Sequence, residues 1–219
     1  MVFGEKFPPI APIHFFRINA DLKYGKEITR KLFGQKLFGK GHQLPDTSSF
    51  LGEEHFADVG VAWHEGGLEV QIQVHQKFEG ASYPKFDEGD AIELFIDTRD
   101  LKEAGFPTKF CHHFLILPQE VQGVRALELT RFRNEDSHPL CEPESIHVET
   151  EMTSKEYTLR ISLPAEIVHG YDPKAFDKMG FTYCIHRPKK ESQHFAVSSK
   201  LIQVAQHPSL WATCKFTTA

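Results

Sequence analysis

Two Cys-x-His pairs, Cys111 with His113 and Cys184 with His186, carry the side chains best suited to chemistry in this chain. Residues two apart on a strand project from the same face, so each pair would present a thiol beside an imidazole. Two such pairs supply the Cys₂His₂ set that Zn²⁺ favours. The spacing therefore predicts a site for zinc, iron or another divalent metal. The structural alternative is that these residues are small core thiols and satisfied strand histidines.

Glu93 is an acidic residue that could act together with these two pairs. It lies in the alternating segment Asp90–Asp97, whose three even-numbered apolar residues face away from Glu93, and such alternation predicts a half-buried strand. Glu93 could accept hydrogen bonds from a ligand's hydroxyl groups. Beside a metal-bound water it could instead be a general base, which would permit metal-dependent hydrolysis. In the segment that holds Cys111, the alternate residue His112 is expected to face the core.

Composition limits the class of protein. The chain has 219 residues, 40% of them hydrophobic, which fits one domain with a sizeable core. The net charge of −5 gives no basic surface for nucleic acid, and no apolar run approaches the roughly 18 residues of a membrane span. The first nine residues lack the apolar stretch of a signal peptide, and the four cysteines are scattered. We therefore expect a cytoplasmic protein with no nucleic-acid or membrane partner.

Short alternating segments from residue 56 onward predict an all-β domain. The expected strands are Phe56–Trp63, Leu68–His75, Asp90–Asp97, Phe110–Leu117, Arg125–Arg133, Ile146–Met152, Tyr157–Leu163, Phe181–Arg187, Phe195–Val204 and Trp211–Phe216. Strand after strand with little helix indicates a single antiparallel β-sandwich of jelly-roll type. Residues 46–219 would form this sandwich. Residues 1–45 would form an N-terminal arm packed on it, with a short helix near Lys26–Phe33.

Three blocks of sequence resemble the family 9-like carbohydrate-binding modules, which are related to the DOMON-like β-sandwiches. The first is Ala62–Val74, with its tryptophan, turn and following strand, and the second is Gly89–Asp97, similar to the family's Asp-x-x-Glu strand. The third comprises Gly180–Tyr183 and the closing segment Pro208–Thr213. The order and spacing of the blocks imply the same fold, and a non-catalytic module that binds a saccharide or glycan-like ligand on the concave face.

The resemblance also implies roles for individual residues. The family's ligand-binding glutamate aligns with Glu93. Its two stacking tryptophans align with Asp87, next to Phe86, and with Ala205, so neither tryptophan is present. Aromatic platforms supply much of the contact with a sugar ring, so Phe86 or Tyr83 would have to stack on the ligand. The full set of expected ligand-binding residues is Tyr83, Phe86, Glu93, Cys111, His113, Cys184, His186 and Arg187.

A third interpretation is an interaction domain whose concave face binds a partner protein. Motifs of acyl-transfer, P-loop and Rossmann enzymes are absent from the sequence, so these classes have no support.

Overall fold

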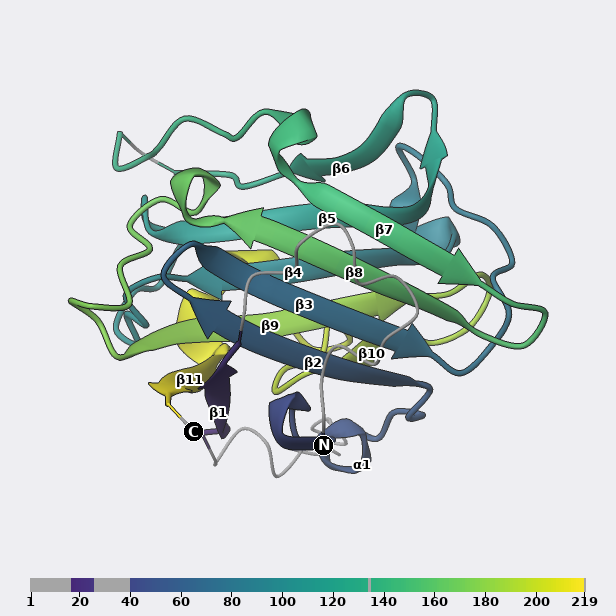
Figure 1. Ribbon diagram of the computed structural model, residues 1–219, viewed down its shortest axis with the longest axis horizontal. Helices are drawn as coiled ribbons and strands as arrows, with labels where there is room; N and C mark the ends of the chain where they lie inside the picture. Colours follow the sequence, from purple (N-terminus) through teal and green to yellow (C-terminus); the bar gives the residue numbers. More distant parts are fainter. Residues whose placement is uncertain (1–16, 26–39, 134, 219) are drawn as a thin grey trace, which may run out of the picture.

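The computed structural model describes residues 17–25, 40–133 and 135–218, and it is built almost entirely of strands (Figure 1). The strands are β1 Asn19–Tyr24, β2 Ala57–His64, β3 Gly67–Val74, β4 Ala91–Asp97, β5 Cys111–Val121, β6 Val124–Glu128, β7 His147–Met152, β8 Tyr157–Pro164, β9 Lys178–His186, β10 Gln193–His194 and β11 Ala212–Thr217. The one α-helix of the described residues is the single turn α1, Ser48–Leu51, and short 3-10 turns complete the list. The all-β expectation is confirmed. The helix expected near Lys26–Phe33 lies outside the described residues.

One continuous hydrogen-bonded sheet connects the strands in the order β6-β5-β4-β9-β11-β1-β2-β3-β8-β7, and β10 pairs with β9. The sheet curls back on itself, so that β7, β8, β3 and β2 lie in front of β5, β4 and β9 in Figure 1. Buried apolar side chains from both halves, such as Val70 and Ile161 from one and Leu94 and Phe181 from the other, form one core. Burial of this shared core drives the two halves together.

The expectation of a wholly antiparallel sheet is wrong at β1. This strand runs parallel to both of its neighbours, β11 and β2, and every other strand pair is antiparallel. Residues 19–24, which the sequence assigned to an arm, are therefore a strand inside the sheet. Parallel neighbours need no hairpin between them, so β1 can join strands that are distant in the sequence.

Two expected strands differ from the structure. The expected strand Phe195–Val204 is wrong. Ala196 has φ +63°, and Val197 N donates a hydrogen bond of 2.7 Å to Phe195 O, so the chain turns here. The strand expected over 125–133 ends at Glu128. Beyond it the His113 amide bonds to the Thr130 hydroxyl at 2.8 Å, which takes the place of a ladder bond.

The central strands β4 and β9 are buried on both faces. Ile92, Leu94 and Ile96 belong to the main core, as the sequence predicts. On the opposite face, Phe95 packs with Cys184 and Trp211 in a smaller apolar cluster. The segment that follows β10 thus covers part of the sheet face that carries Glu93. The rest of this face has a local opening.

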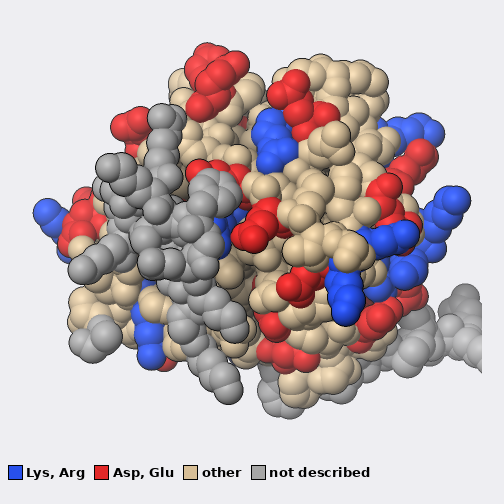
Figure 2. Space-filling view, turned by 45° about the vertical axis from the view of Figure 1, so that its right-hand side comes forward, with Lys and Arg blue, Asp and Glu red and all other residues tan. Residues whose placement is uncertain are grey.

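Acidic and basic side chains lie interspersed on the face drawn in Figure 2. Among the described residues, no helix has the length and apolar character needed to cross a membrane.

Candidate functional site

The candidate site lies on three adjacent strands, with β4 between β5 and β9. Glu93 on β4 is directly opposite Cys184 on β9, and Phe95 on β4 is directly opposite His113 on β5. Residues opposite each other in neighbouring strands, and those two apart along a strand, share a face. The register therefore brings Glu93, His113 and Cys184 to the same side of the sheet, with His186 one step further along β9.

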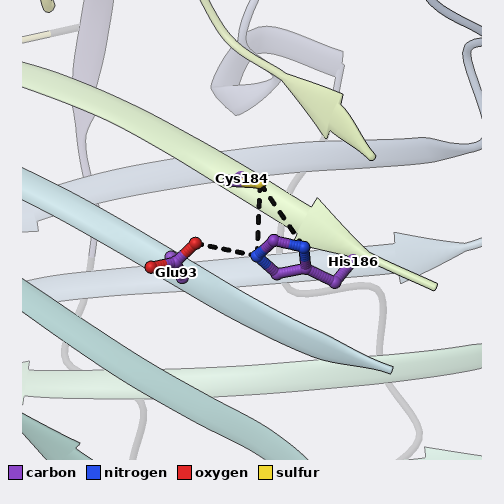
Figure 3. A group of neighbouring side chains, drawn as sticks. All are labelled: Glu93, Cys184 and His186. Carbon is purple, nitrogen blue, oxygen red and sulfur yellow. Dashed lines mark hydrogen bonds and ion pairs between the residues drawn. The ribbon is translucent and has the colours of Figure 1, made fainter. Parts of the chain in front are cut away.

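The Glu93 carboxylate is held between two imidazoles. His113 Nε2 donates to Oε2 at 2.6 Å and His186 Nε2 donates to Oε1 at 2.7 Å, the second of which is drawn in Figure 3. Burial by itself would raise the pKa of Glu93, but the hydrogen bonds and electrostatic attraction of His113 and His186 outweigh it and lower the pKa to about 2. The carboxylate is therefore a charged acceptor over the whole ordinary pH range.

Each imidazole has its own support. His113 stacks on Phe95 with ring centroids 4.4 Å apart. Nδ1 of His186 lies 3.0 Å from the Ser192 hydroxyl, which can donate to it. These contacts fix the ring positions, so the orientation of the carboxylate between them is also fixed.

The two cysteines of the site are protonated core thiols. Burial raises the pKa of Cys111 to about 12, and burial together with the charge of Glu93 raises the pKa of Cys184 well above its ordinary value. Cys184 Sγ lies 3.4 Å from His186 Nε2, the nitrogen that also bonds Glu93 (Figure 3). Both thiols pack in the apolar cluster around Trp211.

The four expected metal ligands do not gather as one set in the described residues. The ligand atoms that come within 4.8 Å of one another here belong to Glu93, Cys184 and His186 (Figure 3), without Cys111 or His113. Both oxygens of the Glu93 carboxylate already accept hydrogen bonds from imidazoles, so no cation is needed to explain the arrangement. A metal at these residues stays a prediction.

A pocket of about 450 Å³ opens above this surface. Its floor includes Glu93, Phe95 and His113, and Phe86 forms part of its wall. Further lining residues are Pro107, Cys111, His112, Leu129, Thr130, Arg131, Cys184, Ser199, Ile202, Gln203, Val204, Ala205, Gln206 and Trp211. Ala205, where the family resemblance places one stacking tryptophan, thus lines the same pocket as Phe86, the neighbour of the other aligned position, Asp87.

Two of the expected ligand-binding residues lie elsewhere. Tyr83 is not among the lining residues and packs against the apolar cluster of Leu115 and Leu117, which Phe86 also contacts. Arg187 bonds to Glu54 at 2.6 Å and its guanidinium lies 4.0 Å from the Phe56 ring centroid. The structure brings Phe86, Glu93, Cys111, His113 and Cys184 to the pocket, and His186 lies beneath Phe86 with ring centroids 5.8 Å apart.

The segment after β10 supplies lining residues that the sequence analysis missed, including Ile202 and Gln203. The polar run Ser198-Ser199-Lys200 inside the expected strand was the available signal, because such clusters favour loops over strands. Trp211 was expected in the core; it is 2% exposed and closes the base of the pocket.

Comparison with known proteins identifies the fold. Two solved structures of a family 9 carbohydrate-binding module from Caldicellulosiruptor kristjanssonii, in complex with cellotriose and with glucose, are similar to this chain with a TM-score of 0.61 and 12% identity. Each similarity covers 92% of this chain, and 94% and 96% of the two modules. The chain therefore has the fold of these modules. No family model and no curated protein sequence matches it.

Proposed function

We propose that this protein is a non-catalytic module that binds a saccharide in the pocket above Glu93. The observation that carries the proposal is the position of the pocket. Ala205, where the family resemblance places one stacking tryptophan, and Phe86, the neighbour of the other aligned position Asp87, both line the pocket, with Glu93 on its floor. The solved modules of the same fold hold cellotriose and glucose.

The lining suits a small polar ligand with apolar ring faces. A volume of about 450 Å³ lies within the roughly 300–1,000 Å³ of small-molecule sites. The Phe86 ring offers a surface for a sugar's C–H face. Glu93, whose pKa is held at about 2, supplies a charged acceptor for hydroxyl groups, and Arg131 and Gln203 add donors at the rim.

Binding of defined saccharides to matched variants tests this function. Glucose, cellotriose and a glycan array are the probes, and isothermal titration calorimetry gives the affinity of any glycan that binds. Phe86→Ala should weaken binding more than tenfold because the stacking surface is lost. Tyr83→Ala, which alters an aromatic residue outside the pocket, should bind like the wild type. Failure of every glycan to bind the wild type, or equal binding by Phe86→Ala, would contradict the proposal.

A further inference from the structure

A second cluster of ligand-type side chains lies on the face of β5 opposite to that of Cys111 and His113. It consists of His112 on β5, Glu128 at the end of β6 and His138 in the loop that follows. All three are buried, with 0%, 4% and 7% exposure respectively. His112 Nδ1 lies 2.9 Å and His138 Nε2 lies 3.0 Å from the same oxygen, Oε1 of Glu128.

The outer nitrogens of both imidazoles face backbone carbonyl groups. Nδ1 of His138 lies 2.6 Å from the oxygen of Lys109, and Nε2 of His112 lies 3.3 Å from the oxygen of His169. A carbonyl oxygen can only accept a hydrogen bond, so these outer nitrogens carry the hydrogen. A neutral imidazole has one N–H, and the inner nitrogens of both rings would then direct lone pairs at the Glu128 carboxylate.

Lone pairs aimed at a carboxylate repel it, and a cation bound between these groups would replace that repulsion by coordination to all three. The Glu93 cluster differs on this point, because the outer nitrogen of His186 faces the Ser192 hydroxyl, which can donate. The Glu93 cluster therefore has a donor on the outer side of an imidazole, whereas the Glu128 cluster has only acceptors there.

We infer that His112, Glu128 and His138 form a binding site for a divalent cation of the zinc class. The ligands would be Nδ1 of His112, Oε1 of Glu128 and Nε2 of His138, all within 4.8 Å of one another. Zinc lies about 2.0–2.2 Å from imidazole nitrogen and carboxylate oxygen in a tetrahedral site, where ligand atoms are about 3.4 Å apart, so the N···O distances of 2.9 and 3.0 Å would widen by about 0.4 Å around one ion. Two histidines and a carboxylate suit zinc better than calcium or magnesium, which prefer oxygen ligands.

The surroundings of the cluster have the features of a supporting shell. Metal-binding histidines usually donate the outer N–H to a carbonyl or carboxylate, as His112 and His138 do here. The second carboxylate oxygen of Glu128 accepts the backbone N–H of Cys141 at 3.0 Å. A bound ion would tie β5 and β6 to the loop that holds His138. Thr130, which bonds Glu128 at 2.7 Å, also lines the pocket, so the ion would stabilise that wall.

Zinc retention by three proteins tests the inference. Untagged wild type, His138→Gln and the matched variant Cys184→Ser, which alters the Glu93 cluster, are stripped with chelator, incubated with zinc chloride and gel-filtered. The zinc content is then measured by plasma mass spectrometry. We expect about one zinc per chain in the wild type and in Cys184→Ser, and at least a tenfold weaker affinity in His138→Gln. A wild type without zinc would overturn the inference, as would full zinc retention by His138→Gln.

A measurement on the wild type alone removes the dependence on a variant that fails to fold. Crystals grown with zinc chloride give an anomalous difference map at the zinc absorption edge. A peak between His112, Glu128 and His138 is the expected result. A peak only at Cys184, or no peak, would overturn the inference.

Discussion

Replacing Glu93 by Gln should remove a charge-dependent contribution to stability that the wild type gains from His113 and His186. The folded-state pKa of about 2, against an ordinary value of 4.5, corresponds to about 3 kcal/mol at roughly 1.36 kcal/mol per pH unit. Because the folded pKa is the lower one, this contribution is complete above about pH 4.5 and is lost as the pH falls through 2. Gln resembles the protonated carboxyl, so the variant should lack the contribution at every pH.

Urea denaturation at pH 7 and pH 3 measures the effect. The wild type should exceed Glu93→Gln by about 3 kcal/mol at pH 7, or about 6–12 °C in Tm for a domain of this size, and by about 1 kcal/mol at pH 3. Glu88→Gln, a change at a side chain that is 61% exposed, is the control and should match the wild type at both pH values. The same difference at pH 7 and pH 3, or none at pH 7, would refute the charge argument.

Three further predictions concern the framework and the pocket. Gly67→Ala should destabilise the protein by at least about 2 kcal/mol more than Gly52→Ala in urea denaturation, because a Cβ at Gly67, with φ +142°, would lie 2.2 Å from the Leu163 oxygen, whereas Gly52, with φ +65°, has open space around it. Equal losses would show that the contact with β8 relaxes. Glu53→Gln should cost about 2–3 kcal/mol by the same assay, since its buried carboxylate accepts bonds from His194 and Ser198, while Glu54→Gln at the exposed neighbour should cost little. Matching effects at the two positions would count against this role. Ala205→Trp should tighten the binding of any saccharide that the wild type binds by about tenfold, measured by calorimetry, since it adds a second aromatic wall; unchanged or weaker affinity would show that residue 205 does not face the ring.

Much of the sheet could be predicted because the alternation of side chains is a local signal. His64 pairs with Gly67 across the turn, as the turn residues predict. The majority of the ends of β4, β5 and β9 lie within one or two residues of the expected bounds. The strand expected over 195–204 failed because its apolar residues are buried against the pocket floor without forming a ladder. Burial alone does not distinguish a covered loop from a strand.

The site could be predicted only in part, because pairing between strands is not local. The sequence places Cys184 and His186 on one face, and the family resemblance adds that Glu93 lies near them. The roles of Tyr83 and Arg187 depended on loop geometry, and Arg187 turns to an ion pair with Glu54 and away from the pocket. The cluster around Glu128 was missed because His138 comes from a loop with no periodic pattern.

The parallel strand β1 has a consequence for how this chain is made. It is the hydrogen-bonded link between the two halves of the described sheet, β6-β5-β4-β9-β11 and β2-β3-β8-β7. On one side of this link, Leu22 of β1 pairs with Phe216 of β11, so these two residues are synthesised far apart in time. The halves can collapse against each other earlier, but the link between them can form only after residue 217 has been added. Until β11 has been added, β9 and β1 lack their shared partner and have open edges that can pair with another chain, which makes the nascent protein prone to misassembly at that stage.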